Sequence, residues 1–126
     1  MPRSRSRVPS PRSLKVSDAF KSFVLDQLAQ LAETGDVTTK SMFGGVGLYC
    51  NGLFFGIIAR DVLYLKVDAS NRPDFERTGS RPFKPYPNRS GTMQYYEVPV
   101  DVLESAVDLT AWARKSVSVA ARAGRK

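Results

Sequence analysis

The stretch Leu48-Tyr49-Cys50-Asn51-Gly52-Leu53-Phe54-Phe55 decides the fold of this chain. Its Asn-Gly pair stands between two apolar runs, and both residues tolerate a positive φ, so the stretch predicts a β-hairpin. Arg60-Asp61 separates the next two apolar runs and predicts a second hairpin, although Arg-Asp is a poorer turn than Asn-Gly. Together these hairpins predict an antiparallel meander of about three strands, with an extra strand around Val37–Met42.

In the sequence, helical patterns both precede and follow these strands. Ser17 is placed to cap a first helix that ends before Gly35, and its apolar stripe consists of Phe20, Phe23, Val24, Leu28 and Leu31. A last helix is expected from about Asp108, with an inner face formed by Leu109, Trp112, Ala113, Ser116, Val117 and Ala120.

Shorter elements are expected between the meander and the last helix. Ser70 or Asn71 can cap a short helix that has Pro73 near its first turn and Gly79 after its end. A strand over 93–98 and a helical turn at 102–103 follow. The predicted fold is therefore α+β: an antiparallel β-sheet meander packed against N- and C-terminal helices, with a short helix in the middle. Its expected buried residues are Phe20, Leu28, Phe55, Leu65 and Trp112.

The net charge of +7 is unevenly distributed. All 12 acidic residues lie between positions 16 and 113, where they outnumber the 9 Lys and Arg. Residues 1–15 are basic and rich in Arg, Ser and Pro. We therefore expect a disordered tail over 1–15, a folded domain over 16–121 and a basic tail over 122–126. The N-terminal cations that could meet nucleic-acid phosphates are Arg3, Arg5, Arg7, Arg12 and Lys15.

Several kinds of active site are excluded by composition. The chain has no histidine and a single cysteine, Cys50, so it can form neither a His-based catalytic pair nor a thiolate zinc site. We expect no enzyme activity, no metal and no cofactor. The lone cysteine, together with the absence of an apolar run of the roughly 20 residues that span a bilayer, predicts a cytoplasmic protein without membrane contact.

Two further motifs each allow two interpretations. The Gly-rich run at Gly44, Gly45 and Gly47 could hold a phosphate, but a strand rather than a helix follows it, which favours a bulge or a close backbone approach. The loop over 81–89 interleaves cations with aromatic residues. Arg81, Lys84 and Arg89 could meet phosphates, and Phe83, Tyr86 and the nearby Tyr95 could form a partner surface, or the rings could fold back over the core.

An ordered set of motifs in this chain resembles the N-terminal domain of the TfoX/Sxy family of competence regulators. The opening strand 42–49 and the strand 63–66 carry the resemblance together with Gly52, Phe55-Gly56, Phe75, Gly79, Phe83, Tyr86, Tyr95-Tyr96, Val98-Pro99, Leu109 and Trp112-Ala113. The resemblance covers about positions 18–120. It implies a regulator that assists the cyclic-AMP receptor protein at certain promoters. Family members usually carry a second, C-terminal domain. This chain ends soon after its expected last helix, so we expect it to be a stand-alone copy of the first domain.

Three functions follow as hypotheses. The first is a non-enzymatic regulatory module that contacts a transcription-regulator protein. The second is direct, non-specific binding of DNA through the basic tails and the 81–89 loop. The third is a small-molecule site between the sheet and the helices, which would require a well-formed apolar pocket.

Overall fold

The fold is known from a computed structural model that describes residues 14–84 and 94–123. One antiparallel sheet has the strand order β1-β2-β3-β4-β5, which is also the order of these strands along the chain. Its strands are β1 (Val37–Met42), β2 (Gly45–Cys50), β3 (Leu53–Ala59), β4 (Val62–Lys66) and β5 (Tyr95–Glu97). The predicted meander is therefore confirmed, together with the two further strands expected around Val37–Met42 and over 93–98.

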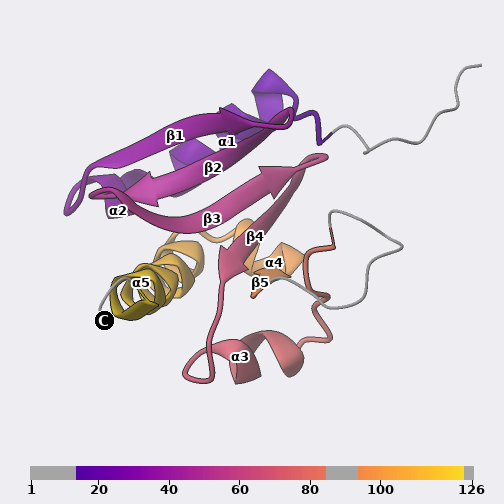
Figure 1. Ribbon diagram of the computed structural model, residues 1–126, viewed down its shortest axis with the longest axis vertical. Coiled ribbons are helices and arrows are strands. Elements are labelled where there is room, and N and C mark those ends of the chain that lie inside the picture. The colour runs from indigo at the N-terminus through magenta and orange to yellow at the C-terminus, as the bar shows by residue number, and fades with distance from the viewer. Residues whose placement is uncertain (1–13, 85–93, 124–126) are drawn as a thin grey trace, which may run out of the picture.

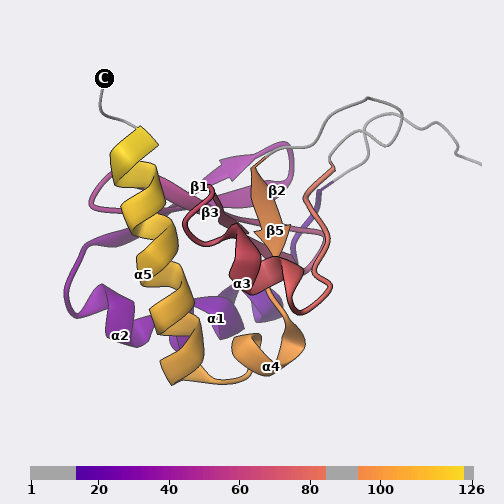
Figure 2. The same ribbon diagram turned by 90° about the horizontal axis from the view of Figure 1, so that it is seen from below.

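Helices pack against one face of this sheet (Figures 1 and 2). They are α1 (Asp18–Gln27), α2 (Ala29–Ala32), α3 (Arg72–Glu76), α4 (Val100–Leu103) and α5 (Ala106–Ala123). The predicted α+β arrangement is confirmed. None of the helices in the described part of the chain is both long and apolar enough to cross a membrane.

Three tight turns join the first four strands, and each has a positive φ at both central residues. Asn51 and Gly52 have φ values of 52° and 81°, as predicted for this hairpin. Arg60 and Asp61 also adopt this conformation, at 51° and 58°. The turn between β1 and β2 places Phe43 at 52° and Gly44 at 86°. Turns of this kind match the right-handed twist of the strands they connect.

The main core lies between the sheet and the helices. Leu28, Phe55 and Leu65 are at most 1% exposed, as predicted. Phe20 and Trp112 are only partly buried at the edge of this core, so their predicted burial is correct only in part. The Trp112 ring meets the Phe75 ring edge-on, with centroids 4.7 Å apart, and this contact joins α5 to α3.

A second, smaller core lies on the opposite face of the sheet. Leu14, Ile57, Ala59, Phe83 and Tyr95 are buried there. The predicted tail over 1–15 was therefore too long. The amide of Leu14 donates to the carbonyl of Phe43, and its carbonyl accepts from the amide of Arg60. These bonds and the burial of its side chain make Leu14 part of the fold, whereas residues 1–13 lie outside the described chain.

The helices differ from those predicted in two boundaries and in one cap. The first helix is interrupted at Leu28, whose amide is shared between the carbonyls of Val24 and Leu25. Helix α5 begins at Ala106 rather than near Asp108, because the Ser105 hydroxyl accepts from the Asp108 amide and caps the helix. Asn71 precedes α3, but its side chain bonds elsewhere and makes no cap.

Candidate functional site

The structure describes three of the cations predicted to meet nucleic acid. Lys15, Arg81 and Lys84 are exposed. The segment 81–83 runs beside β5, because the Arg81 carbonyl accepts from the Glu97 amide at 2.9 Å and the Phe83 amide donates to the Tyr95 carbonyl at 2.8 Å. The rest of the predicted set lies outside the described residues: Arg3, Arg5, Arg7, Arg12 and Arg89.

The predicted partner surface does not form from the rings named for it. Phe83 and Tyr95 are each only 3% exposed, because both belong to the second core. The Phe83 ring packs against Tyr64 with centroids 4.7 Å apart. Burial of Tyr95 raises the pKa of its hydroxyl to about 12. These two side chains therefore fold back over the sheet, and Tyr86 lies outside the described residues.

The Gly-rich run does not precede a helix, so it lacks the row of helix amides that holds a phosphate. Gly44 takes part in the turn and Gly45 and Gly47 lie in β2. A Cβ on Gly45 would stand 2.8 Å from the Ile58 carbonyl oxygen, which is too close. The expected close backbone approach is confirmed at this position.

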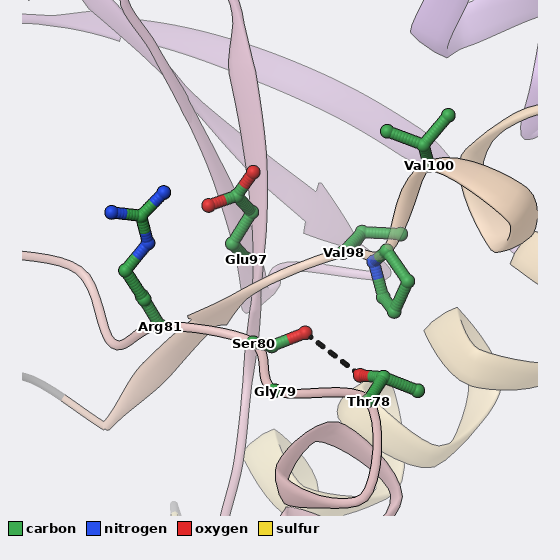
Figure 3. Close-up of a pocket in the computed structure, with 8 residues that line it drawn as sticks. Thr78, Gly79, Ser80, Arg81, Glu97, Val98 and Val100 are labelled. Atoms are coloured by element: carbon green, nitrogen blue, oxygen red, sulfur yellow. Dashed lines mark hydrogen bonds between the residues drawn. The ribbon is translucent and has the colours of Figure 1, made fainter.

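A shallow pocket lies where α3, β5 and α4 meet (Figure 3). Its volume is about 240 Å³, and its lining includes Thr78, Ser80, Arg81 and Glu97. The hydroxyls of Thr78 and Ser80 are hydrogen-bonded to each other at 3.0 Å. Small-molecule sites are usually larger, roughly 300–1,000 Å³, and mostly apolar. This open, polar pocket gives the small-molecule hypothesis little support.

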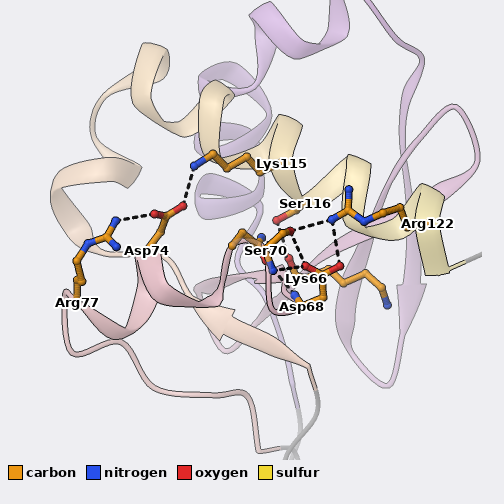
Figure 4. Close-up of polar contacts among 9 residues, drawn as sticks. Lys66, Asp68, Ser70, Asp74, Arg77, Lys115, Ser116 and Arg122 are labelled. Carbon is orange, nitrogen blue, oxygen red and sulfur yellow. Dashed lines mark hydrogen bonds and ion pairs between the residues drawn. The ribbon is translucent and has the colours of Figure 1, made fainter.

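A polar cluster fastens the region around α3 to α5 (Figure 4). Asp74 pairs with Lys115 at 2.8 Å and with Arg77 at 2.6 Å. Beneath these pairs, the Ser116 hydroxyl donates to the Lys66 carbonyl at 2.8 Å.

Asn71 completes this cluster from the inside. It is 2% exposed, its side-chain amide donates to the Lys66 carbonyl, and its side-chain oxygen accepts from the Asp68 amide. Each of these polar groups thus has a partner within the protein, so the role of the cluster is to hold the region around α3 to α5.

The described residues contain neither a cluster of metal ligands nor an activated thiol. Among residues 14–84 and 94–123, no three His, Cys, Asp or Glu side chains gather to hold a metal ion. Cys50 is buried on the core side of β2, and burial raises the pKa of its thiol. A thiol protonated in this way is a poor nucleophile.

The turn between β1 and β2 presents the most exposed large apolar side chain of the described residues. Phe43 is 83% exposed, although its backbone adopts the left-handed conformation that bulky residues avoid. Arg60, in the turn between β3 and β4, lies at the same end of the sheet, because Leu14 bonds to both turns. We call these two turns, 43–44 and 60–61, the turn end.

The face of the sheet away from the helices carries a row of aromatic rings in contact. Tyr49 stacks on Phe54 with centroids 5.0 Å apart, and Phe54 meets Tyr95 at 5.5 Å. The ammonium of Lys66 lies 5.0 Å from the centroid of the Tyr95 ring. Lys40 pairs with Gly47 across β1 and β2, which puts its side chain on this same face. We call this set the aromatic face: Lys40, Tyr49, Phe54, Lys66 and Tyr95.

Neither the turn end nor the aromatic face was predicted from the sequence, and each omission has a physical reason. Strand β2 is apolar on both faces, so periodicity gave no sign that Tyr49 points away from the helices while Leu48 and Cys50 point toward them. Phe43 precedes a glycine, and this position in a two-residue turn usually holds Asn or Asp. The Phe-Gly pair between two strand-like runs was therefore a signal of an unusual turn.

The geometry defines an α+β domain with no assembled catalytic site among its described residues. The family model described as the TfoX N-terminal domain matches residues 29–120 of the 126-residue chain. Because the match covers well over half of the chain, the protein belongs to the TfoX N-terminal domain family, a family of regulatory type. No curated protein matches the chain.

Proposed function

We propose that this protein is a non-enzymatic regulatory module that acts in the cytoplasm by binding a transcription-regulator protein. Its family supports a competence-regulator-like role. The cyclic-AMP receptor protein, which the family resemblance implies, is the first partner to test. The observation that carries the proposal is the state of Phe43 at the turn end.

Phe43 is unfavourable for the isolated domain in two ways. A left-handed backbone costs an ordinary L-residue roughly 1–2 kcal/mol. The side chain is also 83% exposed, so it contributes little burial to offset that cost. Backbone strain of this kind collects at binding and switch sites. An exposed aromatic ring at the tip of a rigid hairpin is suited to enter an apolar pocket of a protein partner.

Polar residues lie at the same end of the sheet as this ring. Arg60 and Lys15 are exposed near the turn end. Asp61 accepts a hydrogen bond from the Ser17 amide at 2.8 Å, which ties the start of α1 to the second turn. A rigid apolar tip surrounded by polar groups is the usual arrangement of a protein interface.

The test compares two exposed apolar residues that are each replaced by asparagine. Phe43→Asn should weaken binding to the cyclic-AMP receptor protein on promoter DNA by at least tenfold, because anchors of this kind carry about 2 kcal/mol or more. Val107→Asn is the matched control, since Val107 is 65% exposed on α5, on the helix side of the sheet. Binding is measured by fluorescence anisotropy of the labelled promoter. Equal binding by wild type and Phe43→Asn, or no binding by the wild type, would refute the proposal.

A further inference from the structure

Cations lie on both sides of the sheet, and those of the aromatic face stand beside its rings. The helix side carries exposed acids and also exposed or partly exposed cations: the acids are Asp18, Asp26, Glu33, Asp101, Glu104 and Asp108, and the cations are Lys21, Arg72, Arg77, Arg114, Lys115 and Arg122. By contrast, β1, β2 and β3 contain no acidic residue. On the aromatic face, Lys40 is exposed and Lys66 is partly exposed. Glu97, the cross-strand partner of Tyr64, adds an acid at the β5 edge of this face, so attraction of a polyanion to the Tyr49 and Phe54 rings depends on Lys40 and Lys66.

Gly47 leaves room for two rings of this face beside the backbone of β2. A Cβ on Gly47 would stand 2.6 Å from the Met42 methyl, 3.1 Å from the Phe54 ring and 3.3 Å from the Tyr49 ring. These three side chains therefore lie against the backbone of β2. Tyr49 and Phe54 both remain partly exposed, and their rings are inclined by only 22° to each other.

We propose that the aromatic face binds single-stranded RNA. Nucleic-acid bases stack on exposed aromatic rings, and each stacked base contributes about 1–3 kcal/mol. Tyr49 and Phe54 offer such rings, while Lys40 and Lys66 stand on either side of them to meet phosphates. A double helix hides its bases, so it cannot use this surface in the same way.

Hydroxyl groups at the edge of the face favour RNA over DNA. Thr38 is the cross-strand partner of Tyr49, and both side chains point away from the helices. Cross-strand partners are neighbours on one face, so these two side chains offer hydroxyl groups that can donate to and accept from a ribose 2′-hydroxyl. DNA lacks that group, and the 2′-hydroxyl is what lets a protein distinguish the two.

The test uses the full chain and a fluorescein-labelled uridine decamer, with anisotropy measured at several salt concentrations. Tyr49→Leu should weaken binding about tenfold, because it removes one stacking ring and keeps an apolar side chain. Lys40→Gln and Lys66→Gln should each reduce the log–log salt slope by about 0.7, the value for one phosphate of a single strand. The basic ends of the chain are the same in every variant, so differences between variants report on the face.

Matched controls come from α1. Phe23→Leu removes an aromatic ring that is 37% exposed, and Lys21→Gln removes a cation, both on the helix side. Neither should change the affinity or the salt slope. If Tyr49→Leu binds as tightly as wild type, or if a thymidine DNA decamer binds as tightly as the RNA, the proposal is wrong.

A second measurement does not depend on any variant. The wild-type chain is irradiated with a decamer that contains 4-thiouridine, and the cross-linked peptides are identified. Cross-links to the peptides that contain Tyr49 or Phe54 would support the proposal. Cross-links confined to residues 1–13 and 122–126 would overturn it, since the RNA would then be held by the ends of the chain alone.

Discussion

The carboxylate of Asp68 lies 3.0 Å from the guanidinium of Arg122, 54 residues further along the chain. The same guanidinium donates to the Ser70 hydroxyl at 2.8 Å. These contacts join the loop after β4 to the C-terminal end of α5, and they make part of the stability of the fold depend on pH.

Lowering the pH should therefore destabilise the fold over the range in which Asp68 and Asp74 take up protons. Hydrogen bonds from the Ser70 hydroxyl and amide, helped by Arg122, lower the pKa of Asp68 from 3.8 to about 2. Lys115 and Arg77 also lower the pKa of Asp74. A carboxyl group with a lowered native pKa stabilises the fold above its unfolded pKa, and this contribution is lost as the pH falls through the native value. The urea concentration at the midpoint of unfolding should therefore decrease as the pH is lowered from 4 to 2.

Asp68→Asn should make that decline shallower and should lower the midpoint only modestly at pH 7. The effect is small because the Asp68 side chain is 39% exposed, and exposed pairs contribute little. Asp101→Asn, an exposed carboxylate on α4, is the control and should leave the pH profile unchanged. An Asp68→Asn profile identical to wild type would show that the Asp68–Arg122 pair adds no pH dependence.

Two buried hydroxyls on α5 should respond to substitution with opposite signs. Thr110 is 4% exposed, and its hydroxyl has no hydrogen-bond partner among the described residues. Thr110→Val keeps the shape and removes the unsatisfied group, so it should raise the free energy of unfolding by about 1 kcal/mol. Ser116→Ala should lower it by about 1 kcal/mol, because the Ser116 hydroxyl bonds the Lys66 carbonyl. Chemical denaturation measures both, and a loss of stability in Thr110→Val would show that its hydroxyl has a partner.

Gly35 and Cys50 should show energetic coupling. A Cβ on Gly35 would stand 2.6 Å from the Cys50 sulfur, closer than real contacts allow. Gly35→Ala should therefore destabilise the fold by about 1–3 kcal/mol. In a Cys50→Ala background the sulfur is absent, so the added cost of Gly35→Ala should be much smaller. A double-mutant cycle measures the difference, and purely additive effects would contradict this account.

The meander and its helices could be predicted from the sequence because their signals are local. Asn51-Gly52 demanded a turn, and Ser17 supplied a cap whose hydroxyl accepts from the Phe20 amide at 3.1 Å. Leu14 could not be assigned to the fold in this way. Its neighbours are basic and polar, and its place depends on two turns, at Phe43 and Arg60, that are distant in sequence.

The candidate surfaces were not predictable for a similar reason. The aromatic face requires knowledge of which side of each strand faces the helices, and a bulge changes this within β3. Tyr49 pairs with Phe54 while Leu48 pairs with Gly56, so Phe55 is an additional residue in β3. Phe55 and Gly56 therefore both face the helices, while Phe54 and Ile57 face the other way. Simple alternation along an apolar strand does not reveal a bulge of this kind.

Asparagine should stabilise the fold at either Phe43 or Arg60, the first residue of each turn in the turn end. Phe43 and Arg60 have φ values of 52° and 51°, and asparagine accepts this conformation more readily than either. Phe43→Asn and Arg60→Asn should each raise the free energy of unfolding by up to about 1 kcal/mol. For Phe43 this gain should accompany the loss of partner binding, so stability and binding change in opposite directions. Destabilisation by Phe43→Asn would mean that the ring supports the fold.

Gly45→Ala and Gly47→Ala form a matched pair in one strand. A Cβ on Gly45 would lie 2.8 Å from the carbonyl oxygen of Ile58, a backbone atom of β3 that cannot move without breaking the ladder. Gly45→Ala should therefore cost about 2–3 kcal/mol. A Cβ on Gly47 would meet the flexible end of Met42 and the edges of two rings, all of which can shift.

Alanine also restricts the unfolded chain, and relative to glycine in a strand this gain is roughly 0.5–1 kcal/mol. For Gly47→Ala the gain and the cost of moving three side chains should nearly cancel, so its free energy of unfolding should stay within about 1 kcal/mol of wild type. The displaced Tyr49 and Phe54 rings should still change the near-ultraviolet circular dichroism spectrum. Equal losses of stability in the two variants would show that the backbone atom at Gly45 and the side chains at Gly47 give way equally little. An unchanged spectrum in Gly47→Ala would show that the rings do not rest on Gly47.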